Sequence, residues 1–218
     1  MNLALEGVEI AMPDGRSLIA SANLTFEQGV TTLVGENGSG KSTLLRALFG
    51  LHPLKAGAIR FGPYDHRRDR KAFLAHAVFV PQNFTAYPEL SGREFLGYFL
   101  RLRGQSKRIA NERSREWLAV VGLESAAESR TGTYSAGMLH RLGFAYALQT
   151  GAPLCVMDEP FAGVDPRARA VLTDLLFDVS VDRVTIVCTH HVNEMAERGA
   201  ATSHITGGRI TLGAPQSR

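Results

Sequence analysis

The chain has 218 residues, of which 44% are hydrophobic, and this is enough for one sizeable domain with a buried core. Its 24 basic and 21 acidic residues give a net charge of +3, which is too small to indicate nucleic-acid binding by itself. No apolar stretch approaches the length of a membrane span and the polar start is not typical of a signal peptide, so we expect a cytoplasmic protein.

The N-terminal part is predicted to form paired strands followed by a strand and a helix. Apolar and polar residues alternate over residues 3–10, a turn signal follows at 12–16, and residues 18–26 form a second strand paired back on the first. A β-branched run at 30–34 then predicts a buried strand, and leucines at helical spacing predict a helix over 41–49.

Between this strand and this helix the chain fills the pattern Gly-x-x-x-x-Gly-Lys-[Ser/Thr] of a phosphate-binding loop. Its glycines let several backbone N–H groups point at one anion, and the helix N-terminus adds partial positive charge. We expect Lys41 to reach the β- and γ-phosphates of a nucleotide and Ser42 to place its hydroxyl on Mg²⁺. The alternative is a glycine turn before an ordinary helix. The predicted loop consists of Gly35, Glu36, Asn37, Gly38, Ser39, Gly40, Lys41, Ser42 and Thr43.

The middle of the chain is predicted to be mostly helical. A short strand at 58–61 precedes a basic run at 66–71, which we interpret as a solvated helix face because no aromatic residues interleave with it, and we expect no nucleic-acid partner. An apolar strand at 77–80 follows. Helical patterns then dominate to about residue 150, with Gly104 separating the first two helices.

The remaining elements restore the alternation of strands and helices. An apolar strand at 154–157 ends in Asp158, Asp165 and Pro166 start a helix, and a strand at 184–188 leads to His190 before a short helix and two weak strands. This pattern predicts an α/β fold with a largely parallel sheet, in one domain over 1–218 with an inserted helical lobe at about 91–150. Both cysteines lie in strand-like apolar runs and are predicted to be small core residues.

Polar residues at the strand ends carry the predicted chemistry. Asp158 can hold Mg²⁺ directly or through water, and Glu159 is the candidate to orient and deprotonate an attacking water. A solvent-exposed acidic pair is the alternative. His190 could donate a hydrogen bond to the γ-phosphate, although spacing alone also fits a structural histidine. We reject a zinc site at 190–194, because the two histidines are not four residues apart on a helix.

These elements, in this order, resemble the nucleotide-binding subunit of ATP-binding cassette (ABC) transporters, and the likeness covers nearly the whole chain. The stretches 87–96 and 136–143 resemble one subgroup in particular, whose members serve exporters of drugs, polysaccharides and similar cargo with a separate membrane subunit. The elements that carry the resemblance are the loop 35–42, Gln82 after its strand, the signature-like turn 134–138, the strand end 158–160, the segment 162–165 and Thr189-His190.

The resemblance implies a P-loop NTPase core with an N-terminal antiparallel β subdomain, binding ATP and Mg²⁺. It implies that Gln82 senses the γ-phosphate and Mg²⁺ beside the surface where a membrane subunit docks. Ser135 and Gly137 would contact ATP held by a second ABC ATPase chain, in a homodimer or heterodimer, and Asp165 would contact the partner's site. The protein would then lie at the inner face of the cell membrane through its membrane subunit.

Two departures from the family pattern affect these expectations. The signature is usually Leu-Ser-Gly-Gly-Gln, whereas this chain has Tyr134 and Ala136 at its first and third positions and Met138, which the exporter subgroup shares, at its last. The methyl group of Ala136 either crowds a phosphate or demands an unfavourable backbone angle. The family also stacks adenine on an aromatic residue, and that position falls near Met12, whose thioether covers a base loosely.

The resemblance favours an ATP-hydrolysing subunit that powers an exporter. Two alternatives remain open at this point: a soluble ABC ATPase acting on nucleic acid or ribosomes, and a nucleotide-dependent regulator that hydrolyses weakly. Relatives of the first kind typically carry long coiled-coil insertions or two cassettes, which this sequence lacks. Lys41, Asp158 and Glu159 are all present and argue against the second.

Overall fold

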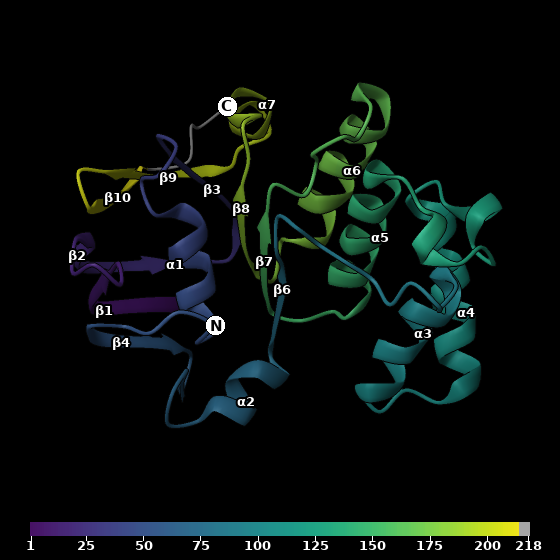
Figure 1. The fold of residues 1–218 in the computed structure, drawn as a ribbon, viewed down its shortest axis with the longest axis horizontal. Coiled ribbons are helices and arrows are strands. Elements are labelled where there is room, and N and C mark those ends of the chain that lie inside the picture. The colour runs from purple at the N-terminus through teal and green to yellow at the C-terminus, as the bar shows by residue number, and fades with distance from the viewer. Residues whose placement is uncertain (214–218) are drawn as a thin grey trace. The chain divides into compact units, whose positions relative to one another are not determined.

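The computed structural model describes residues 1–213, which divide into two compact units (Figure 1). Within the described residues, the first unit comprises Met1–Phe79, Ala152–Asp158 and 177–213, and the second comprises Val80–Gly151 and Glu159–Leu176. The α/β class predicted from the sequence is confirmed, with an antiparallel sheet near the N-terminus and a second, largely parallel sheet. None of the helices among residues 1–213 has the length and apolar character that crossing a bilayer requires.

The antiparallel sheet of the first unit forms because its strands alternate buried and exposed residues. Leu3 and Leu5 are buried, and the register then shifts so that Val8 and Ile10 are buried as well. Gly7, with φ of 59°, lies at this shift and gives the strand the backbone freedom that a bulge needs. The strand order is β2 (Ser17–Phe26), β1 (Leu3–Ala11), β4 (Ala56–Phe61) and β5 (Tyr64–Asp65).

The second sheet carries the ends of the strands at which a nucleotide site is expected. β7 and β8 are buried along their whole length, as central strands covered on both faces are. The pairs β3–β9, β3–β8 and β7–β8 are parallel, and β10 pairs antiparallel with β9. The strand order is β10 (Arg209–Gly213), β9 (Ala201–Thr206), β3 (Gly29–Gly35), β8 (Val184–Cys188), β7 (Leu154–Asp158) and β6 (Ala77–Val80).

The helices of the first unit are α1 (Lys41–Leu48), α2 (Arg70–Ala75) and α7 (Val192–Glu197). The interpretation of the basic run 66–71 as one solvated helix face is wrong, because α2 begins only at Arg70 and His66 is 3% exposed. The Asp65 carboxylate accepts the backbone N–H groups of Arg67 and Arg68, which holds this segment in a turn. His66 packs edge-on against Phe73.

The second unit contains α3 (Gly92–Leu102), α4 (Lys107–Val120), α5 (Ala136–Gln149) and most of α6 (Pro166–Val179), with 3₁₀ turns at Glu124–Ala126 and Thr131–Thr133. Gly104 separates α3 from α4 as predicted. A Cβ atom at Gly97 would lie 3.3 Å from the Ser114 hydroxyl oxygen, so this glycine allows the close packing of α3 on α4. Asp165 accepts the N–H groups of Arg167 and Ala168, which confirms the predicted cap of α6.

Candidate nucleotide-binding site

The predicted phosphate-binding loop connects β3 to α1 in the first unit. A Cβ atom at Gly35 would lie 2.6 Å from both the Ile205 carbonyl oxygen and the Ser39 hydroxyl oxygen, so a side chain does not fit there. Gly40 has φ of 102° and caps α1 without a side-chain hydrogen bond, and the first turn of α1 carries no acidic residue. The N–H groups at the start of α1 therefore remain open to an anion.

The Lys41 side chain lies over this loop. Its ammonium donates hydrogen bonds to the carbonyl oxygens of Gly35 at 2.7 Å and Glu36 at 2.9 Å. Both acceptors are neutral, and phosphate oxygens form stronger, charge-assisted hydrogen bonds with an ammonium group. The Lys41 ammonium therefore lies where the oxygens of an incoming phosphate can replace these two carbonyl oxygens as its acceptors. Ser42 and Thr43, both half-buried, lie in the same first turn of α1.

Besides the Thr32 hydroxyl on β3, two buried side-chain oxygen atoms of the first unit lack a hydrogen-bond partner within the described residues. They are the Ser39 hydroxyl and Oδ1 of Asp158, whose side chain is 3% exposed. A buried carboxylate oxygen without a partner is costly unless something else satisfies it. A magnesium ion or its bound water is a fitting partner for this oxygen, because Mg²⁺ prefers carboxylate ligands. The residues present therefore fit the implied metal.

The parallel sheet brings Asp158 and His190 to the same edge as the loop. Asp158 is paired in register with Cys188 on β8, and Cys188 is paired with Leu33 on β3. His190 follows two residues after the end of β8, and its side chain is exposed. Since ligands of α/β proteins bind at the carboxyl ends of parallel strands, this edge is the natural place for a nucleotide.

Glu159 follows Asp158 directly and begins the second segment of the second unit. Its φ of 50° places it in the left-handed region, where within residues 1–213 the only other non-glycine residue is Ser21. The Glu159 carbonyl oxygen accepts the N–H of Ala162, which closes the turn after β7. A non-glycine residue held at positive φ is strained, and such residues cluster at functional sites.

The signature-like turn starts α5 in the second unit. Ser135 is the N-cap of this helix, and its hydroxyl accepts the N–H of Met138 at 3.3 Å. Ala136 is the first helical residue and its φ is not positive, so the expectation that its methyl group demands an unfavourable backbone angle is wrong. Helical geometry at this position suits any L-residue. Ser135 and Ala136 are both exposed, so the predicted crowding of a phosphate by the methyl group remains a prediction.

Gly137 packs against the segment that precedes α6. A Cβ atom at Gly137 would collide with the Gly163 carbonyl oxygen, so the signature-like turn and the segment 162–165 approach each other at backbone contact. Gly163, with φ of 67°, bends the chain between Glu159 and Asp165. The pKa of Asp165 is held below its ordinary value, mainly by the backbone N–H of Ala168. These residues form a second cluster of expected site residues.

Gln82 belongs to the second unit, where it follows β6 with an exposed side chain. Its carbonyl oxygen lies 3.3 Å from Nε2 of His140, whose Nδ1 lies 2.9 Å from the Ala136 carbonyl oxygen. His140 therefore links the Gln82 segment to the first turn of α5. Sequence reasoning did not single out His140, since nothing in its spacing marks a bridge to a residue 58 positions away.

Met12 lies in the turn between β1 and β2, half-buried, with its N–H donating to the Arg16 carbonyl oxygen. It does not line the pocket of about 380 Å³ beside the phosphate-binding loop. Residues 36–39 of this pocket belong to the predicted loop, whereas sequence reasoning missed the rest of its wall, where Gly207-Gly208 signals only a turn. The pocket is lined by Ser17, Leu18, Glu36, Asn37, Gly38, Ser39, Ile205, Thr206, Gly207 and Gly208.

The structure thus brings the expected site residues together in two groups. The first unit holds Gly35–Thr43, Asp158 and His190 at one sheet edge, with Met12 in the neighbouring antiparallel sheet's turn. The second unit holds Gln82, Ser135, Gly137 and Glu159.

Comparison with known proteins gives one family for this chain. The protein-family model described as ABC transporter matches residues 19–162. The chain is 33% identical over 189 residues, or 86% of its length, to the human phospholipid-transporting ATPase ABCA7. It is 31% identical over 204 residues, or 93% of its length, to the human retinal-specific phospholipid-transporting ATPase ABCA4. The chain spans 9% of the length of each of these relatives.

Two solved structures share the fold. An ATP-binding subunit of an ABC transporter superposes with a TM-score of 0.90 at 22% identity, covering 98% of this chain and 90% of that one. A dimeric ATP-binding cassette in a post-hydrolysis state, bound to ADP and phosphate, superposes with a TM-score of 0.88 at 21% identity, covering 99% and 100%.

Proposed function

The chain belongs to the ABC transporter family and carries that family's ATPase domain, and we propose that it powers a membrane transporter by binding and hydrolysing ATP. The observation that carries this proposal is the open N-terminus of α1 behind a glycine loop, at the sheet edge where the Oδ1 atom of Asp158 is buried without a partner. Together they offer donors for phosphates and a ligand for a cation.

In the proposed site each residue of this chain has one task. The loop Gly35–Thr43 binds the phosphates through its N–H groups, and Lys41 exchanges its two carbonyl acceptors for phosphate oxygens. Asp158, Ser42 and Gln82 would hold Mg²⁺, and His190 would donate to the γ-phosphate. ATP, when bound, would supply the γ-phosphoryl group that is transferred to water, and Mg²⁺ would neutralise charge on the phosphate oxygens.

Glu159 is the proposed general base. Its strained backbone supports a functional constraint at this position, since nothing in a simple turn after a strand requires glutamate at positive φ. Glu159→Gln keeps the shape and removes the base, so we expect unchanged ATP affinity and turnover reduced by at least a hundredfold, within the range known for general bases of about 10²–10⁴. Equilibrium dialysis and phosphate release measure the two quantities.

A matched control is Glu89→Gln, because Glu89 is an exposed carboxylate of the same unit outside the proposed site. It should leave both quantities unchanged. Turnover in Glu159→Gln that equals the wild-type value would remove Glu159 as the base. Loss of ATP binding in Glu159→Gln would instead show that the residue maintains the structure of the site.

A second ABC ATPase chain, identical or different, is the proposed partner across the nucleotide. The support is that Ser135 and Ala136 are exposed at the open start of α5, a helix with no acidic residue in its first turn. Such an N-terminus favours a phosphate. The ADP-bound relative with the same fold is a dimer, which agrees with this arrangement.

A membrane subunit is the other proposed partner, with this chain on the cytoplasmic side of the membrane. We propose that its docking surface includes Tyr87, in the loop after Gln82, and Tyr98 on α3, which are 54% and 46% exposed and whose rings meet edge to face. Aromatic residues that stay exposed are typical of contact surfaces. Phospholipid transport by the two human relatives favours export of an amphipathic cargo. A membrane protein that co-purifies with the wild-type chain, and is lost when both tyrosines are replaced by serine, would support this placement.

A further inference from the structure

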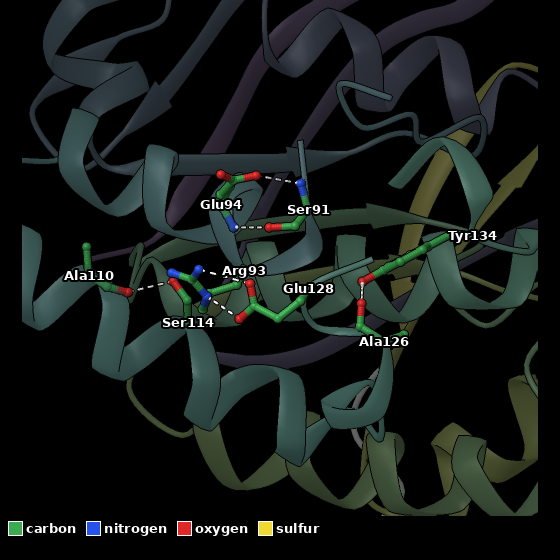
Figure 2. Close-up of polar contacts among 8 residues, drawn as sticks. All are labelled: Ser91, Arg93, Glu94, Ala110, Ser114, Ala126, Glu128 and Tyr134. Atoms are coloured by element: carbon green, nitrogen blue, oxygen red, sulfur yellow. Dashed lines mark hydrogen bonds and ion pairs between the residues drawn. The ribbon is translucent and has the colours of Figure 1, made fainter. Parts of the chain in front are cut away.

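Tyr134 stands where the family usually has leucine, and the proposed function gives its hydroxyl group no role. It immediately precedes Ser135, the N-cap of α5, and its side chain is 7% exposed. The phenol oxygen donates a hydrogen bond to the Ala126 carbonyl oxygen at 2.7 Å (Figure 2). A leucine could fill the same space, but it could not make this bond.

The phenol also contacts the start of α3. A Cβ atom at Gly92 would collide with the Tyr134 phenol oxygen and would lie 3.2 Å from the ring carbon that bears it. Burial raises the pKa of the Tyr134 phenol, and the backbone of Gly92 partly opposes this rise. The hydroxyl group is therefore enclosed between two backbone segments, one at Ala126 and one at Gly92, and it stays protonated at neutral pH.

These two segments are joined to each other by contacts that do not involve Tyr134. The N–H of Thr131 donates to the Leu90 carbonyl oxygen at 2.8 Å, and the N–H of Arg93 donates to the Ala127 carbonyl oxygen at 3.0 Å. The Arg93 guanidinium holds the Glu128 carboxylate with two hydrogen bonds, at 2.6 and 2.9 Å (Figure 2). We name this assembly, residues 90–93 with 126–131, the lobe frame.

The lobe frame is fixed further at the N-terminus of α3. The Ser91 hydroxyl accepts the N–H of Glu94 while the Glu94 carboxylate accepts the N–H of Ser91, which is a capping box (Figure 2). Each such cap stabilises the first turn of a helix by about 0.5–2 kcal/mol. Tyr134 is therefore tied to a rigid support.

We propose that the Tyr134 hydroxyl positions the signature-like turn, Ser135–Gly137, by anchoring the residue before the α5 N-cap to the lobe frame. The inference rests on the proposed function, in which this turn contacts ATP held by a second chain. A helix N-terminus binds an anion well only if its N–H groups already point at one place. Tyr134 supplies this preorganisation, and it is a positioning residue because it touches no nucleotide.

The first test measures the anchor in the free chain. Tyr134→Phe keeps the ring and removes the hydroxyl, and Tyr146→Phe, within α5, is the matched control. The reporters are the amides of Met138 and Leu139, which donate to the Ser135 hydroxyl and carbonyl oxygens. We expect hydrogen exchange at these two amides to become roughly tenfold faster in Tyr134→Phe only, since one buried hydrogen bond contributes at most about that factor.

A second variant tests the contact from the other side. Gly92→Ala pushes the phenol away and should speed exchange at the same two amides. In a Tyr134→Leu background the phenol is gone, so Gly92→Ala should then change exchange less than twofold. Equal effects of Gly92→Ala in both backgrounds would show that the two residues are not coupled, and would overturn the anchor.

The third test measures the consequence for assembly. In a Glu159→Gln background with Mg-ATP, Tyr134→Phe should raise the dissociation constant of the dimer about tenfold while ATP affinity of the monomer stays unchanged. A lower melting temperature with unchanged exchange at Met138 and Leu139 would make Tyr134 an ordinary core residue and refute the proposal. Ser135→Arg, made in the chain that retains Glu159, separates the two ideas. If it leaves turnover intact, the proposed trans contact fails, while the exchange experiment still decides whether Tyr134 is an anchor.

Discussion

The left-handed backbone of Glu159 leads to a prediction about stability and activity together. A non-glycine residue in this conformation costs about 1–2 kcal/mol, whereas glycine adopts it freely. Glycine also loses about 0.5–1 kcal/mol more chain entropy on folding than alanine does. The difference predicts that Glu159→Gly is more stable than Glu159→Ala by about 0.5–1 kcal/mol. Both variants lose the carboxylate, so the comparison isolates the backbone.

Thermal unfolding without nucleotide is the assay, because a bound ligand would add its own stabilisation. For a chain of this size the predicted difference corresponds to a melting temperature about 1–4 °C higher for Glu159→Gly. Neither variant should hydrolyse ATP if Glu159 is the base. If Glu159→Gly is more stable than Glu159→Ala but hydrolyses no ATP, the strained backbone at this position is retained for function.

Two control sites show what glycine and alanine variants do at a positive-φ residue outside the site and at an ordinary helical residue. Ser21, with φ of 48°, is exposed and lies outside the proposed site, so Ser21→Gly should likewise exceed Ser21→Ala in stability, with hydrolysis unchanged. Glu116 is exposed within α4, where glycine should be less stable than alanine by about 1 kcal/mol. The reasoning is refuted if Glu159→Gly is less stable than Glu159→Ala by as much as the glycine variant is less stable than the alanine variant at Glu116.

Three further outcomes are expected. Lys41→Ala should weaken ATP binding at least tenfold in equilibrium dialysis, because the ammonium that exchanges its carbonyl acceptors for phosphate is gone, and unchanged affinity would contradict its role. Competition binding should place GTP within a few-fold of ATP, because Met12 replaces an aromatic platform of the kind that contributes about 1–3 kcal/mol per base, and a hundredfold preference for ATP would disprove this. Glu159→Gln with Mg-ATP should form a dimer in light scattering that Ser135→Arg abolishes, while Ser106→Arg, at the N-cap of α4, should leave the dimer intact.

Local patterns are sufficient to bring the first group of expected site residues to one sheet edge, because each is placed by its own neighbours in the chain. The glycine loop follows a buried strand and opens a helix, which fixes Lys41 and Ser42 within one turn. Asp158 and His190 follow apolar runs, and parallel strands place their carboxyl ends at one edge. Only the alternation of strands and helices was needed to reach this arrangement.

Features that depend on distant partners could not be predicted from the sequence. The hydroxyl of Tyr134 bonds to a residue eight positions away and contacts a glycine 42 positions away, and neither spacing follows a helical or strand period. The basic run at 66–71 was misread for a related reason, since the Asp65 carboxylate organises it as a turn and charge counting does not reveal such bonds.

The two positions of the signature that are usually glycine, 136 and 137, have opposite requirements in the structure. Ala136 lies in ordinary helical geometry, so the extra methyl group costs nothing in the free chain and can act only against a bound phosphate. Gly137 tolerates no such change, because any side chain would strike the Gly163 carbonyl oxygen of the segment that leads to Asp165. The glycine that this chain keeps is the one that holds two parts of the proposed trans contact together. At position 136, where this chain lacks the glycine, the methyl group of alanine can interfere only with a bound nucleotide.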